Sequence, residues 1–296
     1  MEYVVECKNL THYYGKKLIY ENMSFNIKKG SIFGLLGKNG TGKTTTINIL
    51  NGYLKPAAGQ CLIFGEDSQK LPPRTKARIG FLMEGHIQHN FMNIYQIEKF
   101  YSHFFPEWKK EAYYELMSKL EVEPDQKLST MSCGQRSQVA LGLILAQNPD
   151  LMILDDYSMG LDAGYRRLFL DYLNEYAKAE NKTIFITSHI IQDLEDFIDD
   201  CVILDYRGVL LSSGVKEFRD GFKKYRITLN SPNSVQLVKD EVIKNFEIIK
   251  DHCTIYTYSV EDDIKNYLKK SGIQYDNFTE VTMTLEDAFI GLTGKY

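Results

Sequence analysis

The sequence predicts an α/β domain with a largely parallel sheet, followed by a smaller α+β domain. From Tyr3 to about Leu211, short β-rich runs alternate with longer helical patterns, which is typical of strands and helices packed in layers. Residues 85–148 interrupt this alternation with helical, aromatic-rich sequence, which indicates a helical insertion. Towards the C-terminus the order becomes strand-helix-strand-strand-helix-strand. We therefore expect domains at residues 1–218 and 222–296.

The first part of the chain contains three predicted strands and one helix. "YVVECKNLTHYYG" and "NMSFNIKKG" are predicted strands, and Gly30 ends the second. "SIFGLLG" is an apolar strand that enters a glycine-rich loop, and "TTTINILNG" is the helix that leaves this loop and ends at Gly52. A strand, a glycine-rich loop and a helix in this order form a suitable site for an anion.

The helical insertion and two further strands follow. Residues 94–120 and 135–147 are predicted helices, and the second is closed by Asn148-Pro149. "LMILD" and "TIFITS" predict buried strands, with a helix between them around Leu168 to Ala177. The acidic run Asp193 to Asp200 predicts a helix with a solvated face.

The C-terminal residues predict a small ferredoxin-like module. Its predicted strands are residues 224–229, 246–251, 253–259 and 278–284, and its predicted helices are 234–245, 261–272 and 285–294. The second and third strands are separated by one residue, His252, so they are expected to pair as a hairpin.

Composition bounds the class of protein. The 296 residues carry a formal charge of −4, which argues against a broad nucleic-acid surface because such a surface needs a basic face. The five cysteines are scattered and lack C-x-x-C spacing, as in a reduced cytosolic chain without disulfides or structural zinc. The N-terminus has no signal-peptide pattern, and no apolar run approaches the roughly 20 residues of a membrane helix. We expect a cytoplasmic protein that contacts a membrane only through a partner.

The segment "GKNGTGKT", Gly37 to Thr44, matches the phosphate-binding pattern G-x-x-x-x-G-K-[ST] in full. An apolar strand precedes it and a helix follows, so backbone N–H groups and the helix dipole can face a triphosphate. Lys43 is expected to reach the β- and γ-phosphates, and the hydroxyl of Thr44 to coordinate magnesium. The alternative is an ordinary turn with chance glycines, which the full match in this setting makes improbable. These residues predict a P-loop site for ATP and Mg²⁺.

Adjacent acids, Asp155 and Asp156, end the apolar strand "LMILD". In P-loop enzymes a second strand beside the P-loop strand ends in an acid that holds the magnesium ion, and Asp155 fits this role. Asp156 then points beyond the γ-phosphate, where a water is aligned for in-line attack. We expect Lys43, Asp156 and the histidine described next to be catalytic.

Further motifs resemble the ATP-binding subunits of ABC transporters, from Tyr3 to about Leu211. "MSCGQRSQVAL" resembles the family signature, "YSMGLD" its D-loop, and "TSH" its switch histidine, here His189. "HYYG" resembles the aromatic pair that precedes the adenine, which puts Tyr14 in a stacking position, and "IGFLME" resembles the segment that ends in the Q-loop residue. Motif order and spacing agree throughout.

The resemblance implies a head-to-tail dimer that closes around two ATP molecules, with a homologous or identical second subunit and membrane-spanning permease subunits as partners. The residues that it places at the nucleotide are Tyr14, Gly37, Asn39, Gly40, Gly42, Lys43, Thr44, Thr45, Glu84, Ser132, Gly134, Gln135 and Asp162. Ser132 and Gly134 of one subunit are expected to contact the γ-phosphate bound to the other. On its own, "MSCGQ" favours a polar helix N-cap, whereas behind the P-loop we favour the interpretation as the family signature.

Departures from the family pattern concern the catalytic end of the site. The family usually has Glu where this chain has Asp156, Pro-Thr where it has Tyr157-Ser158, and Gln where it has Glu84. A carboxylate one methylene shorter can stand too far from the water to polarise it well. The sequence therefore leaves two readings open, a genuine ATPase and the low-turnover half of a heterodimer.

The end of the chain, "TLEDAFIGLTG", resembles exporter-type ATPase subunits with a C-terminal extension, and "FFPEW" resembles one branch of bacterial export ATPases. We expect a subunit that powers an exporter from the inner face of the cell membrane. A less favoured alternative is a soluble ABC protein that acts on ribosomes or DNA, but paired cassettes, zinc modules and coiled coils are lacking in the sequence. Most of the aromatic residues of 91–108 are interpreted as the core of the insertion. The alternative is that they form a groove for a cytoplasmic helix of a membrane partner.

Overall fold

Apolar runs that are buried on both faces form a parallel sheet in the first part of the chain. The computed structural model describes residues 2–82, 89–119, 123, 125–158, 161–206, 208–232 and 237–294. Its six-stranded sheet has the order β10-β9-β3-β8-β7-β6, and the pairs from β9 to β6 are parallel. The prediction of an α/β fold with a largely parallel sheet is therefore confirmed. These strands are β3 (Ile32–Gly37), β6 (Ile79–Leu82), β7 (Leu151–Leu154), β8 (Thr183–Thr187), β9 (Asp200–Asp205) and β10 (Gly208–Gly214).

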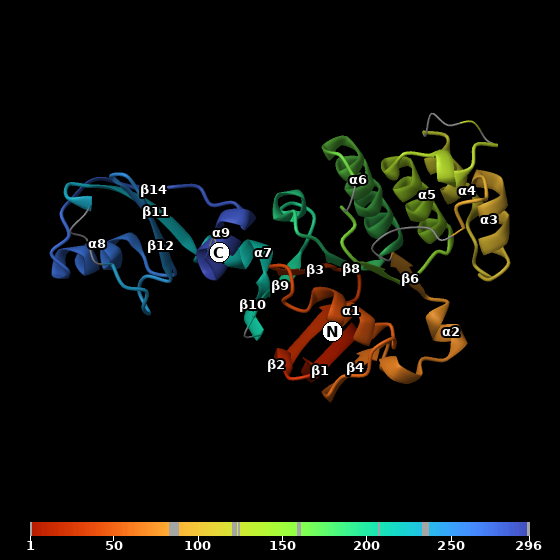
Figure 1. The fold of residues 1–296 in the computed structure, drawn as a ribbon, viewed down its shortest axis with the longest axis horizontal. Coiled ribbons are helices and arrows are strands. Elements are labelled where there is room, and N and C mark those ends of the chain that lie inside the picture. Colours follow the sequence, from red (N-terminus) through yellow and green to blue (C-terminus); the bar gives the residue numbers. More distant parts are fainter. Residues whose placement is uncertain are drawn as a thin grey trace. The chain divides into compact units, whose positions relative to one another are not determined.

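A second, antiparallel sheet covers the first, in the order β2-β1-β4-β5 (Figure 1). Its strands are β1 (Tyr3–Tyr14), β2 (Lys17–Lys28), β4 (Ala58–Ile63) and β5 (Glu66–Asp67). The strand β2 starts earlier than the sequence predicts, because the hairpin turn after Tyr14 needs only Gly15 and Lys16. Helix α1 (Lys43–Leu50) begins in the P-loop and contacts β3 of the parallel sheet and β4 of the antiparallel sheet, and the short helix α2 is Pro73–Lys76.

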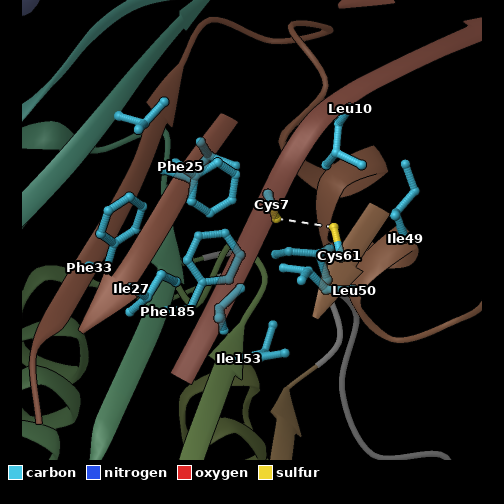
Figure 2. Close-up of a cluster of buried hydrophobic side chains, with 14 of the residues drawn as sticks. Cys7, Leu10, Phe25, Ile27, Phe33, Ile49, Leu50, Cys61, Ile153 and Phe185 are labelled. Carbon is cyan, nitrogen blue, oxygen red and sulfur yellow. Dashed lines mark hydrogen bonds between the residues drawn. The ribbon is translucent and has the colours of Figure 1, made fainter. Parts of the chain in front are cut away.

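The hydrophobic core of this part lies between the two sheets. Phe25 of the antiparallel sheet stacks on Phe33 and Phe185 of the parallel sheet, with ring centroids 5.5 and 6.1 Å apart (Figure 2). Cys7 and Cys61 face each other from β1 and β4 with their sulfur atoms 3.1 Å apart, and both are free thiols. Burial raises the pKa of the Cys7 thiol. The pair packs as small apolar side chains within the core.

Helices α3 (Ile94–Ser102), α4 (Lys110–Met117) and α5 (Cys133–Ala146) lie side by side in the region of the predicted insertion (Figure 1). The single helix predicted from residue 94 to residue 120 is divided at Pro106, which cannot continue a helix. The interpretation of the aromatic residues as core is wrong for four of them. Between 37% and 66% of the side chain is exposed at Phe91, Tyr95, Phe100 and Phe104.

The acidic run after β8 differs from its prediction. Only one 3₁₀ turn, Ile191–Leu194, precedes β9, so no long helix forms there. Its acids are also bonded rather than uniformly solvated, since Asp199 accepts a hydrogen bond from the Ile32 amide at 2.8 Å and Asp200 pairs with Lys28 at 3.4 Å. The long helix α6 (Ala163–Glu180) connects β7 to β8.

The chain separates into two compact units, Met1–Ser212 and Ser213–Tyr296. The second unit has an antiparallel sheet in the order β12-β13-β11-β14. Residues 237–244 are not helical, so the helix predicted over 234–245 is wrong for its described part. The elements are α7 (Val215–Gly221), β11 (Lys223–Leu229), β12 (Asn245–Ile249), β13 (His252–Thr257), α8 (Glu261–Lys270), β14 (Tyr275–Glu280) and α9 (Leu285–Thr293).

Helix α9 packs closely on the sheet of the second unit at Gly291. A Cβ atom there would lie 2.6 Å from the ring of Tyr256 and 2.8 Å from that of Phe222. Helix α7 ends at Gly221, where an added Cβ would meet nothing within 4 Å. The two glycines therefore give a matched pair of sites within one unit.

We predict that Gly291→Ala destabilises the second unit by about 1–3 kcal/mol, the usual cost of overpacking. Gly221→Ala adds the same methyl group without a clash and serves as the control. Urea unfolding followed by circular dichroism measures both. If Gly291→Ala lowers the free energy of unfolding no more than Gly221→Ala does, the close packing of α9 is contradicted.

His12 is buried in β1 with only 6% of its surface exposed. Within the described part of the chain neither ring nitrogen has a hydrogen-bond partner. Burial lowers the pKa of His12 from its ordinary value of 6.5, so the folded protein keeps the ring neutral. As pH decreases through 6.5, the unfolded chain takes up a proton on His12 before the folded protein does. The free energy of unfolding therefore decreases as the pH is lowered through this range.

We predict that His12→Phe reduces the loss of stability on acidification. The difference between variant and wild type should grow as pH falls below 6.5 and level off below the folded pKa. Thermal unfolding at a series of pH values measures this, and His252→Gln is the control because that histidine is exposed. If the melting temperatures of wild type and His12→Phe change with pH in the same way, the lowered pKa of His12 is disproved.

Candidate functional site

The loop between β3 and α1 has the backbone of an anion cradle. Gly40 and Gly42 have φ values of +80° and +105°, which residues with a Cβ atom rarely adopt. A Cβ on Gly42 would also lie 2.7–2.8 Å from Ile19 and Tyr20 of β2. Helix α1 begins directly after Gly42, so its first N–H groups point into the loop without a capping side chain.

Lys43 lies across this loop. Its Nζ donates hydrogen bonds to the carbonyl oxygens of Gly37 at 2.8 Å and Lys38 at 3.1 Å. The ammonium group is thereby held over the mouth of the cradle formed by the loop backbone. A positive charge at this place complements an anion that the N–H groups bind.

Asp155, at the end of β7, faces the start of α1. Its Oδ1 lies 3.4 Å from the Thr44 hydroxyl and accepts a hydrogen bond of 2.9 Å from the Thr187 hydroxyl. Only 4% of Asp155 is exposed. A hydroxyl and a buried carboxylate side by side are hard oxygen ligands of the kind that Mg²⁺ takes, together with waters and phosphates.

Asp156 and His189 form a pair beside these residues. The imidazole Nδ1 lies 2.9 and 3.0 Å from the two carboxylate oxygens of Asp156. A carboxylate accepts, so Nδ1 is the donor and Nε2 of the neutral ring is left as an acceptor. Ser158 donates to Asp156 at 3.0 Å, and the Asp156 backbone has the left-handed φ of +42° that Asp tolerates better than most residues.

One pocket of about 560 Å³ joins these groups. That volume is within the range of small-molecule sites. It brings together ten of the residues predicted from the sequence, and also three that the sequence analysis did not single out, Lys17, Ile19 and Thr187. The lining residues are Tyr14, Lys17, Ile19, Asn39, Gly40, Gly42, Lys43, Thr44, Thr45, Asp155, Asp156, Thr187 and His189.

Two of the missed residues carried a signal. Thr187 directly precedes "SH", and its place at the end of a strand parallel to β3 puts its hydroxyl at the same edge as the P-loop. Lys17 follows the "HYYG" turn and returns along the hairpin to the pocket. Ile19 had no signal, since only the packing of β2 against Gly42 brings it there.

Tyr14 stands at the rim of the pocket with 51% of its surface exposed. Its hydroxyl lies 3.4 Å from the Thr45 hydroxyl. The ring of His12 meets the ring of Tyr14 edge-on, with centroids 5.0 Å apart. The tyrosine ring is therefore supported on one side, and it can offer an aromatic surface to a planar ligand.

Five of the predicted residues that the structure describes lie outside the pocket lining. Ser132 caps α5, since its hydroxyl accepts from the Gln135 amide at 3.1 Å and the Gln135 side chain accepts from the Ser132 amide at 2.9 Å. Asp162 caps α6 by accepting from the Tyr165 amide at 2.9 Å. Gly134 is buried, and a Cβ there would lie 2.6 Å from the Tyr165 ring. Gly37 also stands outside the lining, below the loop, and Glu84 lies outside the described residues.

The described residues hold no metal-binding cluster of another kind. Among the described residues there is no group of three or more His, Cys, Asp or Glu side chains arranged around a common point. In the same part of the chain, no helix has the length and apolar character needed to cross a bilayer.

Curated proteins resemble the whole chain. It is 28% identical to the "Bacitracin transport ATP-binding protein BcrA" of Bacillus licheniformis, over 99% of this chain and 98% of that protein. It is also 28% identical to the "Nod factor export ATP-binding protein I" of Burkholderia orbicola (strain AU 1054), over 98% of this chain and 97% of that protein. The family profile described as "ABC transporter" matches residues 20–158.

Solved structures show the same fold. An ATP-binding subunit of an ABC transporter superposes with a TM-score of 0.65 at 23% identity, over 73% of this chain and 92% of that one. A dimeric post-hydrolysis ATP-binding cassette with ADP and Pi superposes with a TM-score of 0.62 at 22% identity, over 71% and 98%. The fold is that of a P-loop ABC ATPase. The family profile and the relatives agree with these structures: the chain is similar over nearly its whole length to ATP-binding subunits of ABC transporters, and it has the fold of their ATPases.

Proposed function

We propose that this ATPase subunit powers an exporter, and that the Asp156–His189 pair beside the P-loop is its catalytic centre. The observation that carries the catalytic part is the two-point contact of Nδ1 of His189 with the Asp156 carboxylate, at 2.9 and 3.0 Å. This pair shares one pocket with Lys43 and Asp155. Acid, base and phosphate cradle thus lie within reach of one bound nucleotide.

ATP is held at its two ends. The adenine stacks on Tyr14 at the pocket rim, where the exposed ring offers its face. The phosphates lie on the backbone N–H groups that begin α1 at Gly42, with Lys43 donating to the β- and γ-phosphates in place of the loop carbonyls. Asn39, Gly40 and Thr45 line the same wall.

Thr44 and Asp155 are the residues that would hold Mg²⁺ in this site. The 3.4 Å between their oxygens and the burial of Asp155 fit an ion that also keeps phosphate and water ligands. When bound, the ion neutralises developing charge on the phosphates. Thr187 fixes the orientation of Asp155 by donating to its Oδ1 at 2.9 Å.

Asp156 aligns the attacking water and accepts its proton. The water oxygen bonds to the γ-phosphorus as the bond from phosphorus to the β,γ-bridging oxygen breaks, which releases ADP and phosphate. His189 donates to Asp156 through Nδ1, which holds the carboxylate in one orientation. Nε2 is the other hydrogen-bonding atom of the ring, an acceptor in the neutral imidazole and a donor to phosphate in the protonated one.

A second copy or a homologous subunit completes the site. Ser132, Gly134, Gln135 and Asp162 lie outside the pocket lining of their own chain. The capped start of α5 presents N–H groups and the Ser132 hydroxyl, which is a suitable anion cap for a nucleotide bound to another subunit. The solved cassette with ADP and Pi is itself a dimer.

An exposed cluster of aromatic rings supports the proposal that the chain binds a membrane-spanning partner. This aromatic cluster consists of His89, Phe91, Phe100, Tyr101 and Phe104, and His89 and Phe104 lie 5.0 and 5.2 Å from Phe100. Phe91 and Phe104 are 66% and 62% exposed. Clustered exposed aromatic rings mark an interaction surface, here for a cytoplasmic helix of the permease at the inner face of the membrane. The relatives named for bacitracin transport and Nod factor export favour export.

We propose that the second unit is a variant of a ferredoxin-like module, in which residues 237–244, between its first and second strands, are not helical. Its strands in chain order have the spatial order second, third, first, fourth, and all the pairs are antiparallel. That order and the helix α8 between the third and fourth strands agree with such a module. Its own core includes Ile227, Ile255, Ile264 and Leu268.

We predict that Asp156→Asn keeps ATP bound but lowers turnover by about 10²–10⁴-fold, because an amide cannot accept the water's proton. Asn also tolerates the left-handed backbone at this position. Lys43→Ala is the contrast, because it should lose nucleotide affinity as well. Phosphate release and binding of a fluorescent ATP analogue measure the two quantities. Equal turnover for wild type and Asp156→Asn would contradict the catalytic role of Asp156. If the wild-type chain hydrolyses ATP only when it is mixed with another ATPase subunit, it is the low-turnover half of a heterodimer.

We predict that Phe100→Ser combined with Phe104→Ser releases the chain from its membrane partner and leaves ATP binding intact. The change removes apolar contact area from the aromatic cluster without altering the pocket. Co-sedimentation with membranes from the native host measures the bound fraction. The control is Leu210→Ser, since Leu210 is 43% exposed on β10. Unchanged sedimentation of the double variant would exclude this surface.

A further inference from the structure

Asp193 connects three separate segments of the ATPase site. It lies in the 3₁₀ turn Ile191–Leu194, shortly after His189. Its Oδ2 accepts a hydrogen bond from the Tyr157 hydroxyl at 3.4 Å and one from Nε of Arg166 at 2.5 Å. Tyr157 directly follows Asp156, and Arg166 is in the first turns of α6, which Asp162 caps.

Tyr157 is an unusual group to find beside a catalytic carboxylate. Its side chain is buried, with 1% exposed, and its ring stacks on Phe169 of α6 at 5.4 Å. Burial, and next the charge of Asp193, raise the pKa of the Tyr157 phenol, so it stays protonated and can only donate to the carboxylate. The backbone that carries Asp156 is therefore anchored from its C-terminal side.

Arg166 extends the connection toward Asp162. Its Nη1 donates to the Leu161 carbonyl at 3.1 Å while Nε pairs with Asp193. The side chains of Arg166 and Asp193 are only 18% and 23% exposed, so water and salt screen this ion pair less than a surface pair. The planar guanidinium fixes both partners at once.

A second, shorter connection runs parallel to it. Ser158 donates to Asp156 at 3.0 Å and lies 3.2 Å from the Ser188 hydroxyl, which accepts from the Ile190 amide at 2.9 Å. This contact adds to the bonds that Thr187 and His189 already make with the segment of Asp156. Both connections reach Leu161, next to Asp162: its amide donates to the Ser158 carbonyl at 3.1 Å, and its carbonyl accepts from Arg166, which Asp193 holds.

We propose that Asp193 is a positioning residue for ATP hydrolysis, which acts with Tyr157 and Arg166 to hold Asp156, His189 and Asp162 in one fixed arrangement. The inference rests on the proposed roles of Asp156 and His189. Nucleotide binding does not depend on the connection, because Tyr157, Arg166 and Asp193 are absent from the pocket lining. The connection therefore acts on turnover and leaves affinity unchanged.

The test measures kcat, KM for ATP and the melting temperature of the full-length protein for four single variants. Asp193→Asn and Arg166→Gln should each lower kcat about tenfold, within the roughly 100-fold that a 1 Å misplacement can cost, with KM changed less than about twofold. Tyr157→Phe removes only the hydroxyl, retains the stacked ring and should lower kcat by about threefold. Asp193→Glu retains the charge and should restore most of the loss.

A matched control lies one residue away. Arg167 pairs with Asp171 at 3.1 Å on the same helix, but 81% and 54% of these side chains are exposed. Arg167→Gln and Asp171→Asn should leave kcat unchanged. The double variant of Arg166→Gln and Asp193→Asn should be no slower than either single variant, because both remove one connection.

The outcomes separate this inference from the proposed catalytic centre. Unchanged kcat in Asp193→Asn and Tyr157→Phe overturns the inference. A loss of kcat that is proportional to the loss of melting temperature across the variants also overturns it. The same holds if the control Arg167→Gln loses as much kcat as Arg166→Gln. Asp156→Asn, measured alongside, decides the other question. If it abolishes turnover while the Asp193 variants do not, only the positioning role fails. If it has no effect, the catalytic centre itself is wrongly assigned.

Discussion

The parallel pairing of β3, β8 and β7 is the constraint on which the site depends. Parallel neighbours end at the same edge of a sheet, so the loops that follow these three strands meet there. The P-loop follows β3, the two acids follow β7, and the segment with His189 follows β8. Residues more than a hundred positions apart in the chain, such as Thr44 and Asp155, come within 3.4 Å for this reason. The fold thus supplies the geometry, and the motifs supply the chemistry.

Sequence reasoning located this edge well because motif residues are tied to strand ends. The P-loop glycines, Asp155 and His189 each stand directly after an apolar run, and parallel topology then leaves little freedom in where they lie. Ile19 could not be found in this way, because its place depends on how closely β2 approaches Gly42. Side-chain packing between sheets leaves no local pattern in the sequence.

The errors have local causes. The segment 237–244 has apolar residues at helical spacing, but Asp240 accepts hydrogen bonds from the amides of Val242 and Ile243 at 2.8 Å each. Such side-chain bonds offer the backbone an alternative to the helix. Leu237 and Ile243 are still buried in the core of the second unit. The acidic run was misread for another reason, since Asp193 and Asp199 bond to distant segments that charge patterning cannot reveal.

The left-handed backbone at Asp156 restricts which substitutions this position accepts. Asp and Asn enter that conformation readily, whereas a longer side chain there costs on the order of 1 kcal/mol or more. A glutamate would place its carboxylate nearer the nucleotide only at that cost in backbone strain, unless a neighbouring change relaxes the turn first. The shorter acid and its turn are therefore expected to change together over evolutionary time.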